Sequence, residues 1–267
     1  MANLVFPQLS SGAMAQYPIR KQATIRTVKN LMADGSMLVA ADPGAGRLLW
    51  TLNYVSLPVN DMQAIQSHFE ACGGPFRAFT FLDPTDNLLT YSADLTQPIW
   101  GSPTGVTVQP GVRDPNGGMT AFLVTNGSAV TQQLSQTLAA PVSFQYCFSV
   151  YVSAASAGTI DLTMSGGSVE QLTVCLVGQS WSRVSLSGAL QDSGIGLTVG
   201  INLPPGQSLS LFGPQFEPQI APSRFRPTYS NSGLYLNAHW AVPELIFTAT
   251  GPNLFSSSFS IETSVWN

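Results

Sequence analysis

The chain has 267 residues, a net charge of -4, and only 9% charged residues against 44% hydrophobic ones. This length allows one large or two ordinary domains, and we expect two. The negative balance excludes a general attraction to nucleic acid. So few charged residues are not enough to keep a large surface soluble and monomeric. We therefore expect the chain to contact other subunits.

The cysteines and the first residues bear on the cellular compartment. Cys72, Cys147 and Cys175 are widely spaced and form no CxxC pair, which predicts neither a disulfide framework nor a zinc site. Residues 1–18 lack the charged and apolar regions of a signal peptide, and no apolar run approaches the roughly twenty residues that span a bilayer. We expect synthesis in a reducing compartment, without secretion or membrane insertion.

The first third of the chain predicts three strands. Residues 19–26 alternate between apolar and polar side chains, which indicates a strand with one solvated face. Asp34-Gly35 predicts a hairpin turn, residues 36–41 the returning strand, residues 42–44 a further turn, and residues 50–55 a third strand. The local basic residues are Arg20, Lys21, Arg26 and Lys29, and we interpret them as a solvated strand face rather than a nucleic-acid site.

One helix is predicted next. Asn60 or Asp61 is the expected N-cap, and the apolar stripe consists of Met62, Ile65, Phe69 and Cys72. Gly73, Gly74 and Pro75 end the helix. Residues 76–82 are aromatic-rich enough for a strand that would lie beside the helix in one domain.

The region after Gln97 carries a series of short alternating runs. They are residues 142–152, 160–164, 172–176, 184–186, 195–203 and 209–211, separated by Gly, Ser or Pro. Regular short antiparallel strands of this kind are typical of a sandwich or jelly roll. Residues 211–229 are broken by prolines and predict an extended surface segment, after which residues 244–249 and 255–265 predict strands.

These patterns predict a mainly β fold with two domains, one of them discontinuous. The strand at 255–265 has no apolar partner nearby, and the N-terminal strands are few for an independent core. We therefore assign residues 1–96 and 229–267 to one β-sandwich domain with a helix. Residues 97–228 form an inserted jelly-roll or β-sandwich domain.

Several segments resemble a known family. FPQLSSGAMAQYP (6–18), HFEACGG (68–74) and FTFLDPTDN (79–87) together resemble the distal tail proteins of long-tailed bacteriophages. ELIFTATGPNLFSSSFSIETSV (244–265) is similar to the last strands of their tail-ring domain.

The segment FGPQFEPQIAPSRFRPTY (212–229) is similar to the closing element of carbohydrate-binding-like sandwich domains in phage tail tips. The positions that recur there are held by Gln215, Glu217, Pro227 and Thr228.

The resemblance implies a structural protein that forms a ring, a homo-hexamer, between the tail tube and the baseplate hub. Its partners would be copies of itself, the tail tube protein, the tail hub, and tail fibre or receptor-binding proteins, with host surface glycans as a further candidate. Its expected place is the tail tip of the virion, after synthesis in the host bacterial cytoplasm. No catalysis, specific nucleic acid or membrane insertion is implied. The low charge and the strand edges agree with a ring, because a closed ring leaves no edge unpaired.

No catalytic or metal-binding constellation is predicted. His68 and His239 stand in no motif, and we interpret His68 as a partly exposed structural residue on the helix flank. Asp83 and Asp86 could bracket a cation, but a turn after the strand explains them more simply. We expect no enzyme, metal or cofactor, although paired carboxylates that meet only in space stay open as a glycan-hydrolase alternative.

Four aromatic residues could present platforms to sugar rings: Trp100, Tyr146, Tyr151 and Trp181. Tyr146 shares a strand face with phenylalanines, so we expect it in the core. Tyr151 and Trp181 lie on otherwise polar faces and are the candidate glycan contacts, against the alternative of burial on a neighbouring strand or subunit. The alternative function is therefore a carbohydrate-binding, receptor-recognition module of a tail tip.

Overall fold

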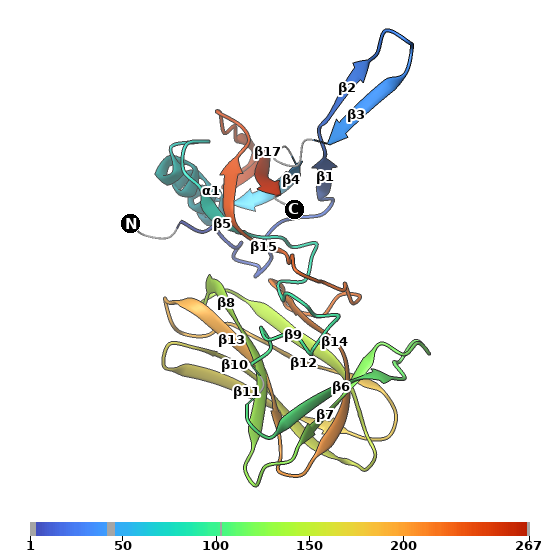
Figure 1. Cartoon of the computed structure of the whole chain (residues 1–267). Helices are drawn as coiled ribbons and strands as arrows, with labels where there is room; N and C mark the ends of the chain where they lie inside the picture. Colours follow the sequence, from blue (N-terminus) through green and yellow to red (C-terminus); the bar gives the residue numbers. More distant parts are fainter. Residues whose placement is uncertain (1–3, 42–45, 102, 266–267) are drawn as a thin grey trace. The chain divides into compact units, whose positions relative to one another are not determined.

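The computed structural model describes residues 4–41, 46–101 and 103–265 (Figure 1). The chain divides into two compact units: unit 1 is Met1–Ser11, Ala15–Phe81 and Tyr235–Asn267, and unit 2 is Gly12–Met14 and Leu82–Leu234. The predicted fold class is confirmed, since several antiparallel sheets and one helix make up the described residues. The turn expected at residues 42–44 lies outside the described residues.

The boundaries between the units differ from the predicted ones at residues 97 and 228. The first lies earlier in the sequence, before Leu82, and the second lies later, after Leu234. The two connecting segments pair with each other inside unit 2. The N–H of Tyr91 donates to the Tyr229 carbonyl (2.7 Å), and the N–H of Asp83 donates to that of Gly233 (2.8 Å). Leu88 also donates to the Phe216 carbonyl at 2.9 Å. These bonds place residues 82–96 and 229–234 with the sandwich rather than with the helix-containing unit.

Unit 1 is built on one six-stranded sheet. Its path is β1 (Arg20–Thr24), β4 (Gly46–Pro58), β17 (Leu254–Val265), β15 (Leu234–Trp240) and β5 (Phe79–Leu82), and β16 (Thr248–Gly251) also pairs with β17. β17 thus lies between β4 and β15, with Phe259 opposite Leu52 and Ile261 opposite Trp50. The last strand of the chain completes a sheet that the N-terminal strands begin. Of the strand expected over 244–249, only the last residues are in β16.

Helix α1 (Val59–Cys72) begins two or three residues earlier than predicted, with Pro58 at the N-cap position, and has no side-chain cap. The predicted N-cap is wrong because Asp61 is engaged elsewhere: its carboxylate accepts hydrogen bonds from the N–H (2.8 Å) and Oγ (3.1 Å) of Ser10. The predicted end is confirmed, with Gly73 in the left-handed conformation at φ 65°. Within the described ranges, no helix is long and apolar enough to cross a membrane.

The interior of unit 1 is aromatic. Trp240 on β15 packs against Phe259 on β17, with ring centroids 4.7 Å apart, and against Phe69 of α1 at 5.1 Å. The fully buried face of α1 consists of Asp61, Ile65, His68 and Cys72. It is rotated from the predicted stripe, so that Met62 and Phe69 are only half-buried.

The N-terminal segment seals one side of this core. Phe6 is fully buried, and its N–H donates to the Thr80 carbonyl on β5 at 2.9 Å. Its ring contacts Phe81 and Trp240. The segment that carries the first part of the family resemblance is therefore a structural element of the core.

A two-stranded hairpin, which we call the arm (residues 25–41), projects from unit 1 (Figure 1). It consists of β2 (Thr27–Leu31) and β3 (Met37–Ala41), joined by the predicted turn, where Gly35 has φ 83°. Every residue from 20 to 40 is exposed. The prediction that residues 19–26 form a strand with one buried face is therefore wrong for β1, because no layer within the described part of unit 1 covers either face.

Unit 2 is a sandwich of two antiparallel sheets. One sheet has the order β11 (Val169–Val177), β10 (Gly158–Gly166), β13 (Ile195–Leu203), β8 (Gln132–Pro141). The other has the order β12 (Ser182–Gly188), β9 (Tyr146–Ala154), β14 (Ser208–Glu217), β7 (Ala121–Asn126), β6 (Val106–Val112). All six predicted runs contain strands, although β9 begins only at Tyr146. β14 continues to a buried Glu217, so the first part of the segment expected on the surface is core.

The sheet of unit 1 predicts how the chain tolerates excision of unit 2. Because Asp83 and Gly233 are hydrogen-bonded neighbours, replacing residues 83–233 by a short Gly-Ser linker should leave a cooperatively folding unit 1. Truncation after Leu234 removes β17 from the middle of the sheet and should abolish that folding. Thermal unfolding followed by circular dichroism measures both. A cooperative transition in the truncated chain but not in the linked chain would contradict the prediction.

Candidate functional site

His68 is a buried core residue, not the partly exposed one that we predicted. It is 8% exposed and lies edge-on to Phe79, with ring centroids 4.7 Å apart. Its Nδ1 accepts a hydrogen bond from Trp240 Nε1 at 3.3 Å, which leaves the proton of the neutral ring on Nε2, 3.6 Å from Cys72 Sγ. Burial lowers the pKa of His68 to about 4. A neutral, enclosed imidazole of this kind stabilises the core.

The other candidates for polar chemistry also serve the backbone. His239 Nδ1 lies 3.1 Å from the Pro75 carbonyl, to which it donates. Asp83 Oδ1 accepts from the N–H (2.8 Å) and Oγ1 (2.6 Å) of Thr85. These bonds form the turn that was predicted after the strand. Among the described residues, no three His, Cys, Asp or Glu side chains are grouped to hold a metal ion.

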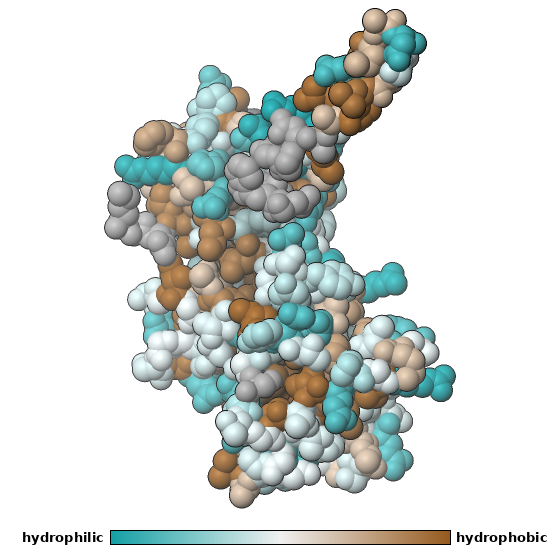
Figure 2. Space-filling view, viewed as in Figure 1, coloured by the Kyte–Doolittle hydropathy of each residue, from teal (hydrophilic) through white to brown (hydrophobic). Residues whose placement is uncertain are grey.

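The arm is an exposed apolar surface. Its large apolar side chains, with their exposed fractions, are Ile25 (76%), Val28 (47%), Leu31 (76%), Met32 (51%), Met37 (61%), Leu38 (56%) and Val39 (53%). The strand register places Leu31 opposite Met37 and Lys29 opposite Val39, so these four side chains share one face. Val28 and Leu38 lie on the other face of the ribbon. Figure 2 shows hydrophobic atoms along the arm. A two-stranded ribbon is only marginally stable alone in water, so the arm gains stability when a partner covers it.

The arm and the preceding strand β1 together are positively charged. Residues 20–41 contain four of the ten Lys and Arg residues of the chain but only one of its fourteen acidic residues. The whole chain has a net charge of -4, so the remainder of each copy is more acidic than the total.

Three of the four residues of the tail-tip sandwich resemblance are buried in unit 2, namely Gln215, Glu217 and Thr228, whereas Pro227 is exposed. Gln215 Oε1 accepts from the Arg226 N–H (2.7 Å), and Glu217 Oε2 accepts from the Ser223 N–H (3.0 Å). Thr228 Oγ1 donates to the Leu89 carbonyl at 2.6 Å. These bonds hold residues 223–228 against β14, so the recurring residues close the sandwich.

The aromatic candidates fall into two groups. Tyr146 is buried, as predicted, and its hydroxyl donates to the Pro141 carbonyl at 2.8 Å; Trp100 is also buried. Tyr151 is half-buried, with the Arg183 guanidinium 5.2 Å above its ring. Trp181 is half-buried just before β12, and no ring contact within the described residues joins it to Tyr151.

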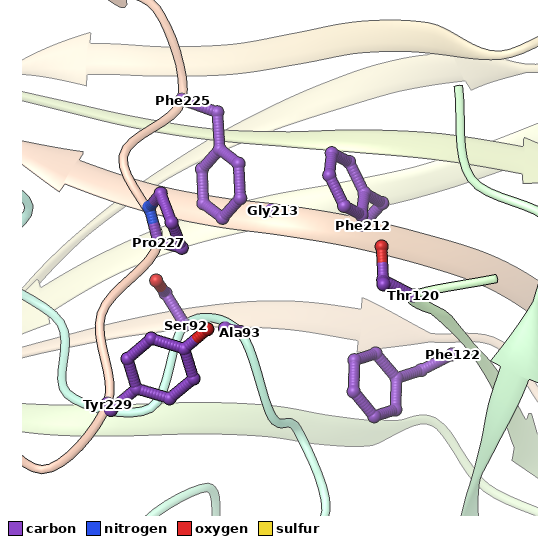
Figure 3. A pocket seen from close by; sticks show the side chains of 9 residues that line it. All are labelled: Ser92, Ala93, Thr120, Phe122, Phe212, Gly213, Phe225, Pro227 and Tyr229. Atoms are coloured by element: carbon purple, nitrogen blue, oxygen red, sulfur yellow. The ribbon is translucent and has the colours of Figure 1, made fainter. Parts of the chain in front are cut away.

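Sequence reasoning missed a pocket of about 330 Å³ in unit 2. Its aromatic walls are Phe122, Phe212, Phe225 and Tyr229, which surround a common space in Figure 3. The signal available in the sequence was the interleaving of aromatic residues with prolines over 212–229. The sequence did not show that β7 brings Phe122 to the same pocket.

No family model matches the chain, and no curated protein matches its sequence. Among solved structures, the enzymatically active domain of tailspike protein 4 of bacteriophage CBA120 is 13% identical, with a TM-score of 0.42. That match covers 51% of this chain and only 22% of the tailspike chain.

Carbohydrate-binding modules also match. The CBM22-1 xylan-binding domain of Paenibacillus barcinonensis Xyn10C is 14% identical, with a TM-score of 0.41, and covers 52% of this chain and 96% of that one. The tandem CBM22-1–CBM22-2 domain of the same protein is 15% identical, with a TM-score of 0.44, over 66% of this chain and 61% of that one. With all three scores below 0.5, these similarities carry no conclusion about function.

Burial of His68 predicts a pH dependence for unit 1. Below pH 6.5 the unfolded chain takes up a proton at His68 that the folded chain accepts only near pH 4. The free energy of unfolding should therefore fall as the pH drops from about 6.5 to about 4, by up to about 3 kcal/mol. Denaturant unfolding across this range measures the fall. His68→Gln should flatten it and His239→Gln should not; an unchanged slope in His68→Gln would contradict the assignment.

Proposed function

We propose that this protein is a non-enzymatic structural component of a phage or phage-like tail tip, which forms a homo-hexameric ring joining the tail tube to the baseplate hub. The observation that carries the proposal is the arm, a positively charged and fully exposed apolar hairpin on an otherwise acidic chain. The resemblance of segments 6–18, 68–74 and 79–87 to distal tail proteins supports the same function.

In this ring the arm of one copy packs on unit 1 of the next. The contact is head-to-tail, because the arm and the surface that it covers are different parts of the chain, and such contacts close when the rotation between copies divides a full turn. Full burial of a Leu or Met side chain contributes about 1.5–3 kcal/mol. Several of them together are of the order needed to offset the entropy lost on association.

The remaining partners follow from the place of the ring. The tail tube protein, the tail hub, and tail fibre or receptor-binding proteins would contact it in the virion, after synthesis in the host bacterial cytoplasm. No step of this function requires catalysis, a cofactor or a metal.

The alternative is a carbohydrate-binding, receptor-recognition module of the tail tip, with Tyr151 and Trp181 as the contacts. The observation that favours it is the partial exposure of both aromatic side chains on a face rich in serine. An adaptor assembles into a ring, whereas a recognition module binds glycans as a monomer.

A matched pair of variants tests the ring. Leu31→Glu places a charge on the arm, where the side chain is 76% exposed, and Leu176→Glu does the same on unit 2, where it is 81% exposed. Neither should lower the melting temperature appreciably. Leu31→Glu should weaken self-association by at least roughly tenfold, because the charge would be buried in the contact.

Sedimentation velocity across a concentration series gives the association state of each variant, and Leu176→Glu should match the unsubstituted protein. Equal effects of the two substitutions, or no effect of either, would remove the arm from the contact.

A further inference from the structure

We propose that the aromatic pocket of unit 2 binds a neutral sugar ring of a glycan. This inference rests on the carbohydrate-binding alternative above and moves the binding site from Tyr151 and Trp181 to the adjoining pocket, whose wall residue Phe212 lies beside Tyr151. The pocket is formed where β7, the middle of β14 and the segment after β14 come together (Figure 3).

The upper wall of the pocket is held in place by the backbone. The β14–β9 register shifts between Phe212 and Gln215, and Gly213 within this bulge has φ 59°. A Cβ on Gly213 would lie 3.0 Å from the Phe225 ring, so the absence of a side chain at this position leaves room for that ring. Phe225 in turn packs edge-on to Phe212 at 5.2 Å.

Phe212 is fixed on its other side as well. Its ring centroid lies 5.9 Å from that of Tyr151, whose own ring is covered by Arg183. The wall is therefore preorganised, which lowers the entropy cost of binding a ligand.

The two small hydroxyl side chains at the pocket, Thr120 and Ser92, both have partners within unit 2, and only Thr120 is exposed. Thr120 Oγ1 donates to Asp114 Oδ2 at 2.6 Å, so it presents lone pairs to a ligand. Ser92 Oγ accepts from the Thr228 N–H at 2.9 Å and lies 2.8 Å from Thr228 Oγ1, so this buried hydroxyl holds the pocket together and does not bind the ligand. Tyr229 is 65% exposed and adds a phenol at the rim. The site thus combines flat apolar walls with a few hydroxyl groups that can exchange hydrogen bonds.

The lining selects the ligand class. It contains no Asp, Glu, Lys, Arg or His, so a charged ligand would lose hydration without gaining a counter-charge. The volume of about 330 Å³ is at the small end of ligand sites and suits one or two sugar rings rather than a helix. A pyranose matches both features, because its C–H faces pack on aromatic rings while its hydroxyls meet the hydroxyl groups of Thr120 and Tyr229.

The test uses the full-length protein and a panel of neutral methyl glycosides of glucose, galactose, mannose and N-acetylglucosamine. Saturation-transfer NMR identifies any that bind, and titration calorimetry measures the affinity. At least one should bind, and Tyr229→Ala should weaken it roughly tenfold, since one aromatic wall is lost. Tyr229 is exposed, so this substitution should leave the melting temperature unchanged. Phe225→Ala, on the opposite wall, should act in the same direction.

Trp181→Ala is the matched control, and it should leave the affinity unchanged. Weakening by Trp181→Ala but not by Tyr229→Ala would overturn the pocket and return the site to the Tyr151 and Trp181 face. Binding of none of the glycosides, or binding only of a proline-rich or aromatic peptide, would overturn the ligand class.

Association state is measured on the same samples. Rings without glycoside binding refute the pocket alone, and glycoside binding by a monomer refutes the ring alone.

Discussion

The fold of unit 1 depends on β17 lying between β4 and β15. Without it, the sheet would separate into an N-terminal piece and a piece made of β15 and β5. The core would separate as well, because the Phe259 ring on β17 joins Tyr54 on β4 to Trp240 on β15. The two ends of the chain must therefore meet before this unit is stable, and the sandwich is tolerated between them because its connecting segments pair with each other.

The features that could be predicted from the sequence are those with a local physical cause. Gly73 ends the helix because glycine adopts the left-handed conformation, and alternation predicted strands such as β13 because one face is buried. β6 was not predicted, because Pro110 interrupts the alternation of apolar and polar residues and no residue of this strand is fully buried. The exposed β1 and the buried His68 were misjudged for one reason: the periodicity of a strand or helix shows which side chains share a face, but not whether another layer covers it.

The candidate sites show the same limit. Phe122 and Tyr229 meet at one pocket although they lie on distant segments, so no local pattern could join them. The segment over 212–229 has two roles that its sequence does not separate. Buried Gln215 and Glu217 fasten it to the sandwich, while Phe225 and Tyr229 from the same segment line the pocket. A motif found in this segment therefore indicates the fold more directly than it indicates a ligand.

The central claim is that the arm drives closure of a ring. Negative-stain electron microscopy of the unsubstituted protein, purified at high concentration, tests it most directly. The expected result is class averages of closed rings in which the arm of each copy lies on the next. A uniform population of single copies, together with tail tips that contain no ring of this protein, would contradict the claim.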